Sequence, residues 1–219
     1  MLPETKLKLN ETIDVPGYKF IGNNRRPTTD RVRIGSGGVG MLISFSFLGI
    51  FDILSIDTQY EGIISILIEH KICTFQLLIR SVYLPPSNSP YGRDPDGFFN
   101  RLLTSAYCYE PHIRLSIGDF NARIGNINDG DGVGSLSNRH VIDDITNAHG
   151  NHFIAYLADS GECVVNGRIT HHLNNYTNVS VANRGGTSVV DYITCDYESL
   201  DYFEGFLVTP LLDFLDSQI

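Results

Sequence analysis

The sequence predicts an α+β sandwich, in which blocks of consecutive strands are interrupted by a few helices. Two observations predict this class: short runs rich in β-branched and aromatic residues are separated by turn signals, and two segments carry apolar residues at helical spacing. The chain has 219 residues, of which 42% are hydrophobic and 19% charged. This balance excludes a disordered chain, and the length is ordinary for one domain with a sizeable core.

The first half of the chain is expected to form consecutive antiparallel strands. Residues 1–36 are polar and turn-rich, and a flexible loop is expected from Arg25 to Gly38. A hairpin turn is expected at residues 69–71. The predicted strands cover residues 39–44, 53–57, 62–69 and 72–83.

The second half mixes helices and strands. Asp94 and Pro95 are an N-cap and a first helical residue, and Pro111 ends that helix. A second helix is expected over residues 151–159, with Gly161 as its C-cap. Residues 126–138 are rich in Gly, Asn and Asp and form a loop. Further strands are predicted over residues 113–119, 162–165, 188–195 and 203–208.

Charge and cysteine content restrict the classes of partner. The formal net charge is −9, which disfavours a DNA-binding protein that relies on bulk attraction to phosphates. An acidic chain can still act on phosphates if its carboxylates hold a divalent cation. The four cysteines have no metal-site or redox spacing, so they indicate buried thiols in a reducing compartment. With no signal-peptide pattern and no apolar run of membrane-spanning length, we expect an intracellular protein, nuclear or cytoplasmic and not secreted.

The segment from Ser116 to Arg123 is the most informative for chemistry. It places Asp119 and Asn121 two positions apart at the end of a strand, so that both point to one side and Phe120 to the other. A carboxylate and an amide in this arrangement can hold and orient a water molecule. The alternative is an Asx turn that ends the strand, which is the commoner role of these residue types.

Three further residues are candidates with simpler alternatives. Asp191 lies in an apolar run, where it could orient a histidine or assist a metal site, or could anchor a loop through backbone N–H groups. Tyr83 ends a strand and could donate to a phosphate oxygen, although an aromatic that caps the core is the simpler interpretation. Glu4, considered alone, is a solvated charge.

Taken together and in order, these segments resemble the endonuclease/exonuclease/phosphatase superfamily, and in particular the endonuclease domain of non-LTR retrotransposons and related craniofacial-development-protein-like sequences. The resemblance runs from one end of the chain to the other, and the Gly-Asp-Phe-Asn-Ala-Arg segment between its flanking motifs makes it specific. The residues that carry it are Glu4-Thr-Lys-Leu7, Gly35-Ser-Gly-Gly-Val-Gly40, Tyr83-Leu-Pro-Pro86, Gly118-Asp-Phe-Asn-Ala-Arg123, Asn166-Gly-Arg168 and Ser188-Val-Val-Asp-Tyr-Ile193.

The resemblance implies a four-layer α/β/β/α sandwich of the DNase I-like kind, with two packed, mostly antiparallel sheets flanked by helices. It also implies phosphodiester hydrolysis with Mg²⁺ or Mn²⁺. By position, Glu4 resembles the metal ligand and Tyr83 the phosphate-contacting tyrosine. Asp119 resembles the residue that orients or deprotonates the attacking water, Asn121 its partner, and Asp191 the aspartate that holds the catalytic histidine.

The sequence departs from the superfamily pattern at both ends. Superfamily members have a strand with an Asn upstream of the Glu-Thr-Lys element, and they end in Ser-Asp-His. Here Asp216 resembles a remnant of that aspartate and a second metal ligand, and no histidine follows His172. We therefore expect residues 1–219 to form one domain that lacks the first strand and the terminal motif. A missing group of this kind lowers the rate on the order of 10²–10⁴-fold.

The expected function is metal-dependent hydrolysis of DNA, impaired by these departures. The alternatives are an inactive relic or interaction module with the same fold and, ranked last, a phosphatase of the same superfamily. We expect a monomer that binds DNA weakly with the help of the metal, and that uses no membrane and no small-molecule cofactor. If Asp191 is buried without a histidine, its pKa should rise.

Overall fold

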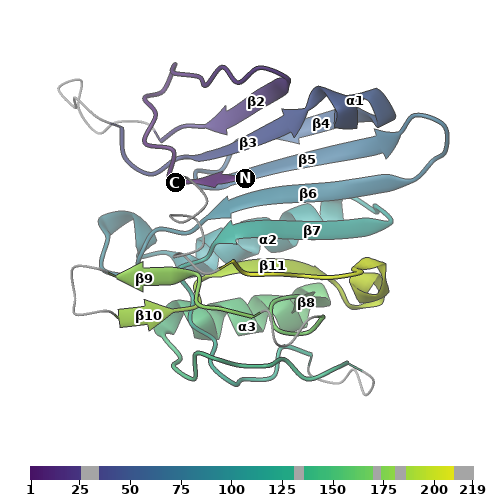
Figure 1. Cartoon of the computed structure of the whole chain (residues 1–219). Helices are drawn as coiled ribbons and strands as arrows, with labels where there is room; N and C mark the ends of the chain where they lie inside the picture. The colour runs from purple at the N-terminus through teal and green to yellow at the C-terminus, as the bar shows by residue number, and fades with distance from the viewer. Residues whose placement is uncertain (26–34, 131–135, 170–173, 181–185, 210–219) are drawn as a thin grey trace, which may run out of the picture. The chain divides into compact units, whose positions relative to one another are not determined.

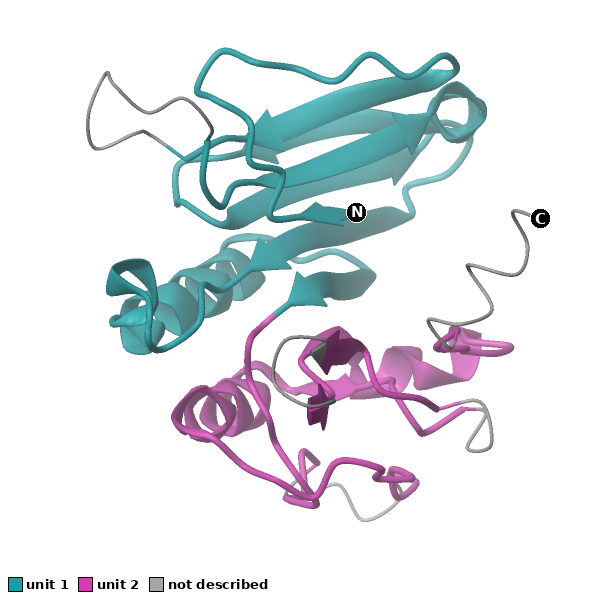
Figure 2. Ribbon diagram, turned by 60° about the vertical axis from the view of Figure 1, so that its left-hand side comes forward, with its two compact units in different colours: residues 1–119 teal, residues 120–219 magenta. Residues whose placement is uncertain are grey.

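A computed structural model describes residues 1–25, 35–130, 136–169, 174–180 and 186–209. The chain divides into two compact units, Met1–Asp119 and Phe120–Ile219, which have separate colours in Figure 2. The sequence contains no linker that signals this division. No helix within the described ranges is long and apolar enough to span a membrane.

Unit 1 contains two groups of paired strands (Figure 1). The smaller group is an antiparallel sheet with strand order β1-β3-β2, formed by Leu2–Pro3, Val39–Ser44 and Tyr18–Asn23. The larger group has the order β4-β5-β6-β7, formed by Phe51–Asp57, Ile63–His70, Gln76–Tyr83 and Ile113–Asp119. Strands β4, β5 and β6 are antiparallel, whereas β7 is parallel to β6. A parallel pair needs a crossover connection, and helix α2 (Pro95–Cys108) provides it.

Helix α2 begins where the sequence predicts. The Asp94 side chain accepts a hydrogen bond from the Gly97 N–H at 2.9 Å, and Pro95 occupies the first turn. Its buried face includes Phe98, Phe99 and Leu102. Arg80 of β6 donates to the Leu102 carbonyl at 3.2 Å, so α2 covers the face of the larger sheet to which Arg80 belongs.

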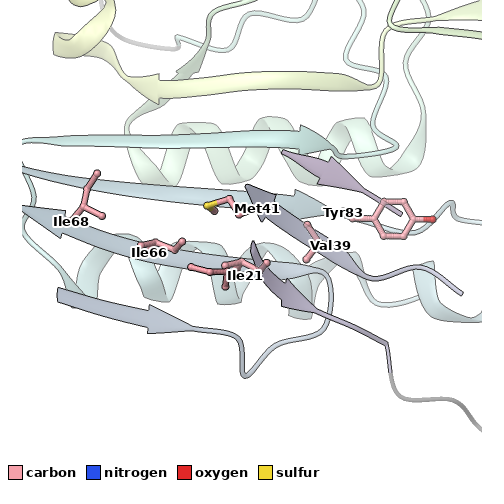
Figure 3. Packing of buried hydrophobic residues seen from close by; sticks show 7 residues of the cluster. Ile21, Val39, Met41, Ile66, Ile68 and Tyr83 are labelled. Atoms are coloured by element: carbon pink, nitrogen blue, oxygen red, sulfur yellow. The ribbon is translucent and has the colours of Figure 1, made fainter. Parts of the chain in front are cut away.

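The opposite face of the larger sheet packs against the smaller sheet. Strand β5 contributes every second residue to this contact, which is the spacing that places side chains on one face. Tyr83 lies at the end of the cluster away from Ile68 (Figure 3). A fully buried isoleucine contributes about 2 kcal/mol, so this layer is a main source of stability for unit 1. The buried members are Ile21, Val39, Met41, Ile64, Ile66, Ile68 and Tyr83.

Unit 2 contains helix α3 (Ala148–Ser160) and two short antiparallel strand pairs. One pair is β8 (Glu162–Val164) with β11 (Asp191–Asp196), and the other is β9 (Asn178–Ser180) with β10 (Gly186–Ser188). The Asn147 side chain caps α3 by accepting from the Gly150 N–H at 2.8 Å. Gly161 ends the helix in the left-handed region at φ 71°, which is the expected C-cap role.

Several elements differ from the sequence prediction. Strand β2 and the short helix α1 (Phe45–Ile50) were not predicted. Strand β2 buries only Ile21, so its alternation is weak, and α1 buries no residue. The strand predicted over residues 203–208 is wrong, because a 3-10 helix (Tyr197–Tyr202) is followed there by irregular chain with no buried residue. Most of the predicted Arg25–Gly38 loop, residues 26–34, lies outside the described residues.

The cysteines are only partly as expected. Cys163 and Cys195 are buried and are register partners on β8 and β11, and their contact and burial raise the pKa of the Cys195 thiol. Cys73 and Cys108 are exposed, so the prediction of four buried thiols is wrong for these two.

Candidate active site

Two strand ends bring a phenol and a carboxylate together. Tyr83 and Asp119 are the last residues of the parallel strands β6 and β7, and they are register partners. Their side chains therefore lie on the same face, which is the face that packs against the smaller sheet. The Leu84 N–H donates to the Asp119 carbonyl at 2.9 Å, so the two strands remain paired at their ends.

Gly118 permits this close pairing. Its φ is +152°, and a Cβ built at this position would lie 1.9 Å from the Val82 carbonyl oxygen. Residues with a side chain rarely adopt this conformation, and here the neighbouring backbone also leaves no space. The glycine that precedes Asp119 in the sequence motif is therefore required for the position of Asp119.

Glu4 reaches the same place from the smaller sheet. The chain after β1 is held by hydrogen bonds from the Thr5 N–H to the Gly38 carbonyl at 3.2 Å and from the Lys6 N–H to the Gly37 carbonyl at 2.8 Å. Glu4 and Lys6 both have positive φ, at 50° and 55°, which is uncommon for residues with a side chain. The Glu4 carboxylate accepts a hydrogen bond from the Tyr83 hydroxyl and lies 3.9 Å from the Lys6 Nζ.

The electrostatics of Tyr83 follow from these neighbours. Burial raises the pKa of its phenol to about 12, and the negative charges of Glu4 and Asp119 act in the same direction, against the opposing charge of Arg25. The phenol, a hydrogen-bond donor while it is protonated, therefore keeps its proton to a higher pH than an ordinary tyrosine does. Tyr83 is 5% exposed, so it serves both as a core residue and as part of this site.

The donor set suits a hard divalent cation better than a soft one. Glu4 offers carboxylate oxygens at the Tyr83 hydroxyl, and the charge of Asp119, the register partner of Tyr83, also acts on this phenol. Mg²⁺ is commonly held by one or two carboxylates and keeps several waters. Across the described ranges, no group of three or more His, Cys, Asp or Glu side chains is placed to hold a metal ion. Asp216, the second ligand predicted from the sequence, lies outside the described residues.

The next candidate, Asn121, belongs to unit 2 and is held through its backbone. Its φ is 45°, and its carbonyl accepts a hydrogen bond from the Asn147 side-chain amide at 3.0 Å. The Asn147 side-chain oxygen also accepts from the Arg123 N–H at 2.9 Å. Phe120 is fully buried and stacks on Phe153 with ring centroids 4.4 Å apart. The capping residue of α3 therefore fixes the turn that carries Asn121.

Arg123, the last residue of the same motif, has a structural partner. Its guanidinium makes two hydrogen bonds to the Asp143 carboxylate, at 2.8 and 2.5 Å. Asp143 also accepts from the backbone N–H groups of Val189 at 2.9 Å and Ile145 at 3.2 Å. Burial alone would raise the pKa of Asp143, but these hydrogen bonds outweigh it and the pKa is lowered. The ion pair therefore anchors the chain that leads into Asp191.

Asp191 is the first residue of β11 rather than an interior residue of a longer strand, which corrects the predicted range 188–195. The Asn166 side chain donates to the Asp191 carbonyl at 3.1 Å and accepts from the Ile193 N–H at 3.0 Å. Burial raises the pKa of Asp191, and a hydrogen bond with Thr177 opposes this rise. The pKa of Asp191 is therefore shifted in the direction that the sequence analysis predicts for a buried carboxyl.

The structure thus brings together three of the predicted site residues within unit 1: Glu4, Tyr83 and Asp119. Asn121 and Asp191 lie in unit 2, each held by its own backbone contacts. Sequence reasoning missed Asn147, although an Asn directly before a helical run is a recognisable N-cap signal. It also missed Asp143, because no local pattern marks the distant partner of an arginine.

Three solved structures show what the chain resembles. The endonuclease domain of TRAS1, a telomere-specific non-LTR retrotransposon, is 16% identical with a TM-score of 0.59, and the match covers 90% of this chain and 75% of that one. The AP endonuclease LMAP from Leishmania major is 13% identical with a TM-score of 0.64, covering 90% and 69%. The catalytic domain of human Nocturnin with bound sulfate is 12% identical with a TM-score of 0.51, covering 82% and 61%.

No protein-family model and no curated protein sequence matches the chain. At identities of 12–16%, the likeness concerns the fold. The mixed helices and strands, the packed sheets of unit 1 and these structural likenesses agree with the class predicted from the sequence motifs. The chain therefore has an α+β, DNase I-like fold, as these structures do.

Proposed function

We propose that the chain hydrolyses phosphodiester bonds in DNA with the help of Mg²⁺ or Mn²⁺. The observation that carries this proposal is that Glu4 accepts a hydrogen bond from the Tyr83 hydroxyl while Asp119 is the register partner of Tyr83 on the neighbouring strand. Two acids and a protonated phenol at one end of two strands can bind a cation, accept a proton and donate a hydrogen bond. Two of the structures of similar fold are endonucleases by name, which supports a nucleic acid as the substrate.

Each residue of unit 1 has a chemical role in this proposal. Glu4 is exposed and offers its carboxylate oxygens to the cation. When bound, the cation neutralises phosphate charge and stabilises the leaving alkoxide. Asp119 accepts a proton from the attacking water and aligns it for in-line attack. The Tyr83 hydroxyl, which donates to Glu4 in the free chain, donates a hydrogen bond to a phosphoryl oxygen when Glu4 binds the cation.

Two candidate residues lie in unit 2. The backbone of Asn121 is held by the hydrogen bond from the Asn147 side chain. Asp191 is held by Asn166 and Thr177, and neither of these can act as a general acid or base at neutral pH. With Asp191 tending toward its neutral form, we expect slow hydrolysis that depends on the carboxylates of unit 1.

A supercoiled-plasmid nicking assay with Mg²⁺ tests this function. The unmodified chain is compared with Asp119→Ala, Glu4→Gln and the matched control Asp52→Asn, an exposed carboxylate paired with Lys71 at 3.6 Å. We expect slow nicking that EDTA abolishes, that Asp119→Ala removes and that Asp52→Asn leaves unchanged. Nicking that persists in EDTA, or that is equal in all four proteins, would contradict the proposal.

An interaction module with the same fold is the second candidate. It is favoured by Asp191, whose buried carboxyl has a raised pKa and a hydrogen bond with Thr177. Absence of nicking at every Mg²⁺ and Mn²⁺ concentration, by a folded chain, would select this candidate.

A further inference from the structure

A stacked pair of side chains lies beside the candidate active site. The Arg25 guanidinium lies 4.1 Å from the centre of the Tyr91 ring, within the range of a cation–π contact. The Arg25 Nε also forms an ion pair with the Glu61 carboxylate. The exposed fraction of Arg25 is 6%, whereas that of Tyr91 is 43%. The pair is therefore a fixed cation beneath an aromatic ring that is still accessible to solvent.

Two sets of contacts place this pair next to the residues of the candidate active site. Glu61 is followed by Gly62, whose carbonyl accepts a hydrogen bond from the Tyr83 N–H at 2.8 Å. Gly62 has φ +82°, and a Cβ at this position would lie 2.4 Å from the Tyr83 carbonyl oxygen. The backbone beside Glu61 is thus packed directly against Tyr83.

The second set of contacts is made by the backbone of Gly37. A Cβ at Gly37 would lie 2.5 Å from the central carbon of the Arg25 guanidinium, so the arginine rests directly on this backbone. The Gly37 carbonyl accepts the Lys6 N–H, two residues after Glu4. The positive charge of Arg25 also lowers the pKa of Tyr83 against the larger raising effects. Arg25 therefore lies close to both Glu4 and Tyr83.

The loop that carries Tyr91 is compact. The Ser89 N–H donates to the Pro86 carbonyl at 2.8 Å, and the Gly92 N–H donates to the Ser89 carbonyl at 3.1 Å. The Ser89 hydroxyl accepts from the Tyr91 N–H at 3.3 Å. Gly92 packs so closely that a Cβ would lie 2.2 Å from the Pro86 carbonyl oxygen. The Tyr91 ring is therefore held at a fixed place in the loop that begins at Tyr83.

We propose that Tyr91, supported by Arg25, is a stacking platform for an unpaired nucleobase next to the phosphodiester bound at Glu4, Tyr83 and Asp119. This inference rests on the proposed function and names its substrate class as single-stranded or unpaired DNA. Every base has a π-face that an aromatic ring can stack on, whereas duplex DNA hides those faces between base pairs. An aromatic ring already fixed by a cation loses little conformational entropy when a base binds.

The platform is tested by binding rather than by hydrolysis. A single-stranded oligodeoxynucleotide carrying 2-aminopurine, whose fluorescence falls on stacking, is titrated with the full chain in Ca²⁺ without Mg²⁺. The variants are Tyr91→Ala, Tyr91→Leu and Tyr91→Phe, with Tyr107→Ala as the matched control, since Tyr107 is an exposed tyrosine of α2 in the same unit. The same oligodeoxynucleotide annealed to its complement is the duplex arm.

We expect the unmodified chain to quench 2-aminopurine and to bind the single strand more tightly than the duplex. Tyr91→Ala and Tyr91→Leu should each weaken single-strand binding about tenfold and abolish quenching. Tyr91→Phe and Tyr107→Ala should behave as the unmodified chain does. Tyr91→Leu retains a bulky side chain against Arg25, so its loss of quenching cannot be attributed to an emptied packing position.

Two results would overturn the platform: no quenching by the unmodified chain, or equal quenching in Tyr91→Ala. These results are separable from failure of the proposed function. If the chain stacks the base through Tyr91 but never nicks DNA, the stacking proposal is supported and the proposed hydrolysis is contradicted. If the chain nicks DNA in an Asp119-dependent way but binds it independently of Tyr91, the proposed hydrolysis is supported and the stacking proposal is contradicted.

Discussion

Tyr83 and Asp119 are register partners at the ends of the parallel strands β6 and β7, and their side chains emerge on the same face. The chain reaches this arrangement by a crossover through α2 and by a glycine at position 118 that allows the strands to meet. Because Glu4 meets the same phenol from the smaller sheet, packing of the two sheets of unit 1 and assembly of the site are one event. Changes that disturb this packing should therefore affect stability and chemistry together.

Replacing Tyr83 with Phe should remove the contribution of this phenol to the pH dependence of the free energy of unfolding. The pKa of Tyr83 is about 12 in the folded chain, against an ordinary value of 10.0. The protonated phenol therefore contributes stability that is fully present below pH 10 and is lost as pH rises toward 12. Urea unfolding of both proteins at several pH values should show that only the unmodified chain carries this loss, while Tyr83→Phe keeps the fold and slows nicking. Identical pH dependence in the two proteins would contradict the assignment.

Gly118→Ala should destabilise unit 1 strongly. The added methyl group would lie 1.9 Å from the Val82 carbonyl oxygen at a φ of +152°, so both overpacking and backbone strain oppose it. We expect a loss of about 3 kcal/mol, measured by urea unfolding. Gly49→Ala is the matched control, because Gly49 lies in α1 with open space around its Cα. That change should be neutral or slightly stabilising, and equal effects at both positions would count against the close approach of β6 and β7.

The sequence predicted the parts of the site that depend on local pattern. The ends of β6 and β7 were placed correctly at Tyr83 and Asp119 because apolar runs end there at Pro and Gly-Asp signals. The α2 cap at Asp94 was also predicted, since an Asp followed by Pro is a strong local signal. The assignment of Glu4 came from motif order, because a short exposed segment has no periodicity.

Contacts between distant residues could not be predicted in this way. The pairs Arg123 with Asp143 and Arg25 with Glu61 join residues 20 and 36 positions apart, and nothing in the local sequence selects one carboxylate over its neighbours. Strand β2 was missed for a related reason: only Ile21 is buried in it, so its strand character depends on pairing with β3 rather than on its own pattern.

Metal binding should be weak and should depend on Glu4. Glu4 and Asp119 supply few protein ligands, and the exposed Glu4 side chain is also engaged by Lys6 at 3.9 Å. Titration calorimetry should therefore show Mg²⁺ affinity on the order of millimolar, weakened further in Glu4→Gln, as expected for a cation that keeps most of its waters. Sub-micromolar affinity that is unchanged in Glu4→Gln would show that other residues hold the metal.

Asp143→Ala should be the more damaging of two ion-pair deletions. It leaves the Arg123 guanidinium without its two hydrogen bonds and removes the acceptors of two backbone N–H groups. We expect a loss of about 3 kcal/mol, whereas Asp52→Ala, which breaks an exposed pair with Lys71, should cost less than about 1 kcal/mol. Because the pKa of Asp143 is lowered in the folded chain, its ionised form contributes to the free energy of unfolding. This contribution is present above pH 3.8 and is lost as the pH falls through the folded pKa. Equal losses in the two variants would contradict an anchoring role for Asp143.

Asp191→Asn should stabilise the protein at neutral pH. Burial raises the pKa of Asp191 above its ordinary value of 3.8, so the folded chain opposes ionisation of this carboxyl more than the unfolded chain does. The stability contributed by the protonated form is complete below pH 3.8 and is lost as pH rises through the folded pKa. Asn resembles the protonated acid in shape and keeps a partner for Thr177, so the variant should escape this loss. Its urea midpoint should equal that of the unmodified chain near pH 4 and exceed it at pH 7, with the gap opening between these values. A variant less stable than the unmodified chain at pH 7 would show that the charged form of Asp191 has a stabilising partner.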